Sequence, residues 1–78
     1  MMFEGRTYVQ TGLGGNSIRF ADQDAGVATT TYNHSMPEEG KAEMARRITA
    51  ALNLTARFST EQIESLASEL NAKDNRHA

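Results

Sequence analysis

The sequence predicts an α+β fold, in which a three-stranded antiparallel β-meander is followed by two α-helices packed on one face of the sheet. Three observations support this prediction. Apolar and polar residues alternate in the first half of the chain, turn-forming segments interrupt that alternation twice, and a helical period begins near residue 35. The 78 residues have room for one domain. We expect it to span residues 1–70, with residues 71–78 as a frayed tail.

The predicted strands occupy residues 3–10, 17–21 and 27–33, where alternation or β-branched residues favour extended structure. Residues 11–16 concentrate glycine and asparagine, which tolerate positive φ and end a strand. Residues 22–26 read DQDAG, a composition typical of a hairpin connection. Because short connections usually join neighbouring strands, the simplest topology is a meander.

The alternation also predicts which side chains the helices cover. The covered face is expected to carry Phe3, Val9, Ile18 and Phe20. Tyrosine and arginine on the opposite, open face are candidates for binding a partner, because both are enriched in binding hot spots. The glycine-rich loop is a further candidate contact. The predicted partner-binding residues are Arg6, Tyr8, Leu13, Arg19 and Tyr32; ordinary strand surface is the alternative interpretation of the same pattern.

The first helix is predicted to begin close to Ser35, because Ser35 and Glu38 have the spacing of a capping box. It is expected to end near residues 53–55. Glu43 and Arg47, four residues apart, are expected to pair on its solvent side. The apolar face comprises Met44, Ala45, Ile48, Ala51 and Leu52, and the polar positions include Glu39, Glu43, Arg46 and Asn53.

The second helix has the clearest local signal in the chain. Ser59 and Gln62 have capping-box spacing, and Phe58 and Ile63 occupy the two positions of a hydrophobic staple. The predicted apolar stripe consists of Ile63, Leu66, Ala67 and Leu70, with Glu61, Glu64 and Glu69 facing water.

Composition argues against several kinds of site. The chain has no cysteine and two histidines, His34 and His77, so clustered zinc ligands are not expected. Residues 22–26 lack the later oxygen ligands of a calcium loop. The glycine-rich loop lacks the lysine of a P-loop and precedes a strand. No serine has a base at a predictable spacing. We therefore expect no cofactor, no metal and no enzymatic activity.

Charge and hydropathy limit the partners in the same way. The formal net charge is −2, and the three glutamates of the second helix would repel phosphates in a helix-turn-helix arrangement, so direct nucleic-acid binding is not expected. No apolar stretch approaches the roughly 20 residues of a membrane span. The first ten residues lack the pattern of a signal peptide. These features predict a cytoplasmic protein.

Two segments resemble a known group of proteins. Residues 24–28 read DAGVA, and the segment from Ala45 to Glu61 contains ARRI, then Asn53, then STE. These segments resemble a diffuse group of small proteins of tailed phages and prophages. The chain departs from the group at Arg57, where glycine is usual, and at Phe58, where a smaller aliphatic residue is usual. The resemblance implies an origin in a mobile element, whose accessory genes commonly encode inhibitors of host defence, including anti-CRISPR proteins.

The expected function is therefore a non-enzymatic phage-type protein that binds and inhibits a host protein complex, such as a CRISPR-Cas defence system, in the bacterial cytoplasm. One alternative is a structural or regulatory homodimer that completes its core by self-association through a sheet edge or the helices. Another is a sponge for a signalling nucleotide, which requires a basic pocket at an oligomer interface.

Overall fold

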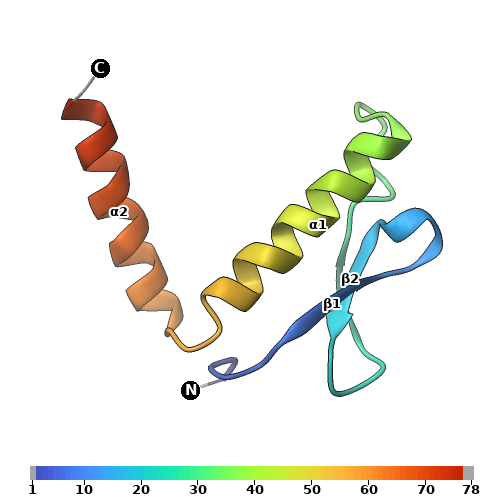
Figure 1. The fold of residues 1–78 in the computed structure, drawn as a ribbon, viewed down its shortest axis with the longest axis horizontal. Coiled ribbons are helices and arrows are strands. Elements are labelled where there is room, and N and C mark those ends of the chain that lie inside the picture. The colour runs from blue at the N-terminus through green and yellow to red at the C-terminus, as the bar shows by residue number, and fades with distance from the viewer. Residues whose placement is uncertain (1, 77–78) are drawn as a thin grey trace.

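A three-stranded sheet and two long helices make up the structure, a computed structural model that describes residues 2–76 (Figure 1). The elements in order are β1 (Tyr8–Thr11), the 3-10 turn η1 (Leu13–Gly15), β2 (Ser17–Phe20), β3 (Gly26–Thr29), α1 (Glu38–Leu54) and α2 (Thr60–Arg76). The strands are antiparallel in the order β1-β2-β3. The predicted α+β class, with a meander followed by two helices, is confirmed.

The strand register corrects one predicted face. Tyr8 lies opposite Phe20, and Val9 lies opposite Arg19. Because opposed residues share a face of the sheet, Tyr8 is on the side of α1 with Phe20, and Val9 is on the open side. The prediction had these two faces of β1 reversed. Residues 3–5 form a bend and turn in which Gly5 has a φ of +79°, so the alternation does not continue from Phe3 into β1, which begins at Tyr8.

The hydrophobic core lies between α1 and the sheet and is small. Its buried residues are Tyr8, Ile18 and Ala45, surrounded by the half-buried Phe20, Ile48 and Leu52. The side chain of Ile18 is fully buried. The ring centroids of Tyr8 and Phe20 are 5.4 Å apart, a distance at which aromatic pairs attract. Few side chains therefore hold α1 on the sheet, and each of them matters.

Asn53 fastens the end of α1 to the start of β1. The backbone N–H of Tyr8 donates to Asn53 Oδ1 at 2.8 Å, and Asn53 Nδ2 donates to the carbonyl oxygen of Tyr8 at 2.9 Å. The side-chain amide thus occupies a hydrogen-bonding position on the free edge of β1. The sequence placed Asn53 among the positions facing away from the core, and its pairing with β1 was not predicted.

The start of α1 differs from the prediction. Its N-cap is Pro37, and no side chain caps it, so the expected capping box of Ser35 and Glu38 is absent. A residue that precedes proline is disfavoured in the helical region, so the helix begins only after Pro37. Glu38 instead pairs with the buried Lys41, with 3.0 Å between Lys41 Nζ and Glu38 Oε1.

The remainder of α1 lies close to the prediction. The helix ends at Leu54, inside the expected range of residues 53–55. The predicted partner of Glu43 was Arg47, but Glu43 pairs with Arg46 at 3.4 Å. Both spacings bring side chains together on a helix surface, and both side chains are exposed here, so the pair contributes little to stability.

The capping box of α2 is confirmed. The backbone N–H of Ser59 donates to Gln62 Oε1 at 2.8 Å, and the N–H of Gln62 donates to Ser59 Oγ at 3.1 Å. Two backbone donors at the start of the helix are therefore satisfied by side chains.

Ser59→Ala should loosen the first turn of α2. Loss of an N-cap hydroxyl costs about 1 kcal/mol, which corresponds to amide exchange about fivefold faster in that turn. Hydrogen exchange followed by NMR measures this change. Ser68→Ala is the control, because Ser68 is an exposed residue in the middle of the helix. Unchanged exchange in Ser59→Ala would contradict a capping role.

The second helix does not pack on the sheet as predicted. Helix α1 contacts β1, β2 and η1, whereas α2 leads away from the sheet and forms the second arm of an open V (Figure 1). It also continues to Arg76, past the end predicted at residue 70. The last two residues of the predicted tail, 77–78, lie outside the described residues. The molecule is consequently thin, with extents of 41 × 32 × 15 Å.

Candidate protein-binding surfaces

The connection between β1 and β2 presents an exposed leucine on a tight backbone. We call residues 12–16 the Leu13 turn. Leu13 is 98% exposed, the most exposed large apolar residue described. Gly12, Gly14 and Gly15 have φ of +85°, +74° and +74°, in the left-handed region that favours glycine. The three glycines thus give the turn a shape that other residues would adopt only with strain.

Several hydrogen bonds hold the Leu13 turn in place. Gln10 Nε2 donates both to the carbonyl oxygen of Gly15 at 2.6 Å and to that of Ala42 in α1 at 3.0 Å. At the end of the turn, Asn16 is buried, and its carbonyl oxygen accepts from the N–H of Thr30 at 2.8 Å. The turn is therefore fixed to α1 and to the loop that follows β3. These contacts brace the glycine-rich loop that the sequence predicted at residues 11–16.

Tyr32 lies at the same end of the molecule as the Leu13 turn. It is 77% exposed and belongs to the loop between β3 and α1. That loop begins at Thr30, whose hydroxyl donates to the carbonyl oxygen of Lys41 at 2.7 Å and to that of Asn16 at 3.2 Å. Of the predicted contact residues, Leu13 and Tyr32 are thus exposed on neighbouring loops.

The two predicted arginines lie at the other end of the sheet, near the β2–β3 hairpin. Arg6 forms an ion pair with Asp22 at 3.0 Å, and its guanidinium carbon lies 4.1 Å from the ring centroid of Phe20. Arg19 donates to the carbonyl oxygens of Phe20 at 2.9 Å and Gln23 at 3.4 Å. Both side chains stabilise the hairpin, and the structure does not bring them to Leu13.

Tyr8 does not lie on an open surface. Its residual exposure is 8%, and its ring faces Phe20 under α1. The prediction that Tyr8 contacts a partner depended on the reversed face of β1 and conflicts with this burial. Tyr8 is a core residue.

The open face of the sheet holds a shallow hollow of about 490 Å³. Its lining residues include Thr11, Ser17, Arg19, Val27 and Thr29. Ser17 Oγ and Thr29 Oγ1 are hydrogen-bonded across the strands at 3.1 Å, so these hydroxyls are already satisfied. The open face is therefore polar and partly self-paired, and it offers fewer free groups to a partner than the sequence suggested.

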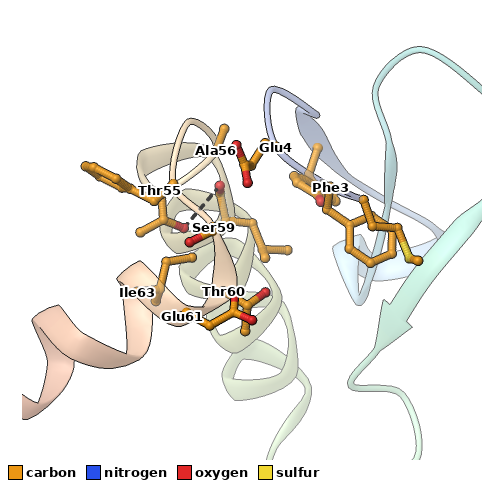
Figure 2. Close-up of a pocket in the computed structure, with 12 residues that line it drawn as sticks. Phe3, Glu4, Thr55, Ala56, Ser59, Thr60, Glu61 and Ile63 are labelled. Carbon is orange, nitrogen blue, oxygen red and sulfur yellow. Dashed lines mark hydrogen bonds between the residues drawn. The ribbon is translucent and has the colours of Figure 1, made fainter.

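A pocket of about 350 Å³ lies where the N-terminal residues meet the connection between the helices; we call it the N-terminal pocket. The N–H of Gly5 donates to the carbonyl oxygen of Ala56 at 2.6 Å and joins the N-terminal residues to the helix connection. Figure 2 shows Phe3 on the sheet side of the pocket and Ile63 on the side of α2. This pocket was not predicted from the sequence, although the staple residues Phe58 and Ile63 both line it.

The charged residues that line the N-terminal pocket are Glu4 and Glu61, and both are acidic. An acidic lining disfavours an anionic ligand such as a nucleotide phosphate. The pocket gives no support to the nucleotide-sponge alternative, which stays a prediction.

Along α2 the predicted apolar stripe is present but uncovered. We call Ile63, Leu66, Ala67 and Leu70 the α2 stripe. Leu66 is 41% exposed and Leu70 is 59% exposed, whereas Ile63 is half-buried beside the N-terminal pocket. Scattered exposed leucines are ordinary, but a helix whose apolar face points to water is a surface that another chain can cover.

Comparisons with known protein families, with curated proteins and with solved structures find no match to this chain. The resemblance to phage proteins therefore stays a prediction.

Over residues 2–76, neither helix has the length and apolar character needed to cross a membrane. Within the same part of the chain, no group of three or more histidine or carboxylate side chains is placed to hold a metal ion.

Proposed function

We propose that this protein is a non-enzymatic binding protein that engages another protein through the Leu13 turn, with Tyr32 as a neighbouring contact. The observation that carries the proposal is the near-complete exposure of Leu13 on a braced backbone. A backbone that is already held in position loses little conformational entropy on binding, and this lowers the cost of association. An apolar anchor of this kind fits a small pocket on a partner surface.

The biological setting that we propose is inhibition of a host defence complex, such as a CRISPR-Cas system, in the bacterial cytoplasm. The resemblance of residues 45–61 to small phage proteins supports this setting. The Leu13 turn supports only the binding step, because an exposed anchor on a small protein suits attachment to a larger complex.

The test is a plating assay in bacteria with an active CRISPR-Cas system directed against the infecting phage. Expression of the wild-type protein should raise plating efficiency. Leu13→Ser should reduce that effect at least about tenfold, since truncating an interface anchor typically costs 2 kcal/mol or more. Its folding should be unaffected, because surface substitutions usually change stability by less than about 0.5 kcal/mol.

Leu54→Ser is the matched control, because Leu54 is also a strongly exposed leucine, at 80%, but lies at the other end of α1. It should behave as the wild type does. A wild-type protein that leaves plating unchanged, and captures no host protein from a lysate of the same strain, would refute the proposal.

A second candidate function is that of a structural or regulatory homo-oligomer. The exposed α2 stripe favours it, because the stripe lies on a different element from the Leu13 turn and needs a separate explanation. The two functions are compatible, since each uses its own surface.

A further inference from the structure

The chain exposes more surface than a folded monomer of its size. Its accessible surface is 6093 Å², whereas monomeric proteins of 8.6 kDa expose about 4,700 Å². Its radius of gyration is 14.5 Å, against about 11.5 Å for a compact chain of this length. The chain therefore exposes about 1,400 Å² more surface than a compact monomer of the same mass.

Much of this excess follows from the position of α2. The helix contributes 17 residues and leads away from the sheet, so its own apolar side chains remain uncovered (Figure 1). The α2 stripe is continuous with the N-terminal pocket, because Ile63 belongs to both. Phe3 extends this surface on the far side of the pocket and is 53% exposed. Apolar side chains thus continue from the N-terminal residues along α2 to Leu70, with the acidic Glu4 and Glu61 beside them at the pocket.

We propose that a second copy of this chain covers that surface, forming a two-fold dimer in which the α2 helices pack antiparallel. This inference rests on the homo-oligomer candidate and is independent of the Leu13 turn. The area is in the range of this occupant: if the contact buries the whole excess of about 1,400 Å² on each copy, the total is about 2,800 Å², within the 2,000–5,000 Å² of obligate homodimers. The small core also supports a dimer, because only three hydrophobic residues are buried among the described residues of one chain.

Two-fold symmetry fixes which residues meet. In an isologous interface, residue i contacts j and j contacts i. Centring the antiparallel pair between Leu66 and Ala67 places Leu70 of each copy near Ile63 of the other, at the mouth of the N-terminal pocket. The α2 stripes of the two copies then cover each other. Leu70 of each copy covers the N-terminal pocket of the other.

Charge favours the antiparallel direction. Lys73 follows Leu66 by seven residues and therefore lies along the edge of the same face. A parallel pair would bring the two Lys73 side chains to the same level, whereas an antiparallel pair moves them apart. The dipoles of two antiparallel helices also oppose each other favourably.

The first experiment measures molar mass by sedimentation and light scattering from 1 to 100 micromolar. The wild type should have twice the chain mass of 8.6 kDa. Leu66→Lys should raise the dissociation constant at least about 100-fold, because it places charge at the centre of the interface. Ser65→Lys is the control and should remain dimeric, since Ser65 lies about 200° from Ile63 around the helix. A monomer throughout, with cooperative unfolding, overturns the proposal, as does a dimer that Leu66→Lys leaves intact.

A second experiment does not depend on how Leu66→Lys folds. The chain lacks cysteine, so a single introduced thiol reports its own surroundings. Ala67→Cys should form a disulfide between copies on mild oxidation, because Ala67 lies near the proposed two-fold axis, and Ser65→Cys should not. Spin labels on Lys73→Cys should be separated by about 20 Å along the helix axes. A separation near 10 Å, or cross-linking of Ser65→Cys in preference to Ala67→Cys, would overturn the antiparallel arrangement.

Discussion

Ile18→Ala is expected to lower the free energy of unfolding by about 3 kcal/mol, the largest effect of any single truncation in this chain. Ile18 is the one large side chain that is fully buried among the described residues. Its removal leaves a cavity between the sheet and α1, and truncations of this kind cost about 2–5 kcal/mol. Small domains have only about 3–5 kcal/mol to lose. The variant should therefore keep at most about 2 kcal/mol of stability, so that its unfolding begins at low urea concentration.

Urea denaturation followed by circular dichroism measures this loss, at one protein concentration for all variants because self-association shifts apparent stability. Val27→Ala is the matched control: it also truncates a β-branched aliphatic residue in the sheet, but Val27 is 41% exposed. Its loss should stay below about 1 kcal/mol. Equal losses in the two variants would show that the core is not centred on Ile18.

Asn53→Ala should cost about 2–3 kcal/mol, although Asn53 was expected to face away from the core. The substitution removes both hydrogen bonds between its side-chain amide and the backbone of Tyr8. Both bonds are part-buried, and a net hydrogen bond of this kind is worth about 0.5–1.5 kcal/mol, so the loss of two accounts for the expected cost. The start of β1 should also separate from the end of α1.

Asn53→Asp can keep the bond from the N–H of Tyr8 but loses the bond to the carbonyl oxygen of Tyr8. The carboxylate still accepts from the N–H of Tyr8 but places a charged oxygen against the carbonyl, so we expect it to be at least as destabilising as alanine. Asn33→Ala is the control, because Asn33 makes one exposed side-chain bond, to the N–H of Ser35 at 3.1 Å. It should cost less than about 1 kcal/mol. Wild-type stability in Asn53→Ala would refute the fastening role.

Local signals in the sequence predicted the elements well. The hairpin composition of residues 22–26, the glycines after β1 and the capping box at Ser59 act over a few residues, and each produces the expected turn or helix start. The failed capping box at Ser35 is also local in origin. Pro37 delays the helix more strongly than Ser35 favours an earlier start, and the sequence contains both signals.

The candidate surfaces were harder to predict because they depend on register and packing. The turn before β1 interrupts the alternation that was expected to run from Phe3, and Tyr8 therefore lies in the core and not on the open face. The exposure of Leu13 was expected, but the bracing by Gln10 joins residues 32 positions apart and leaves no local pattern. The N-terminal pocket likewise needs Phe3 beside the helix connection. Contacts between residues far apart in the sequence cannot be predicted from patterns among neighbouring residues.

The open V of the two helices makes α2 a separate unit of local unfolding. Its backbone hydrogen bonds lie within the helix, and its apolar stripe makes no broad contact with the sheet. Opening of α2 is then governed by helix propensity, by its cap and by whatever covers the stripe, and not by the stability of the sheet. An isolated helix of this length is marginal in water. If a second copy covers the stripe as we propose, the order of α2 depends on protein concentration, and proteolytic cleavage within the helix should increase on dilution.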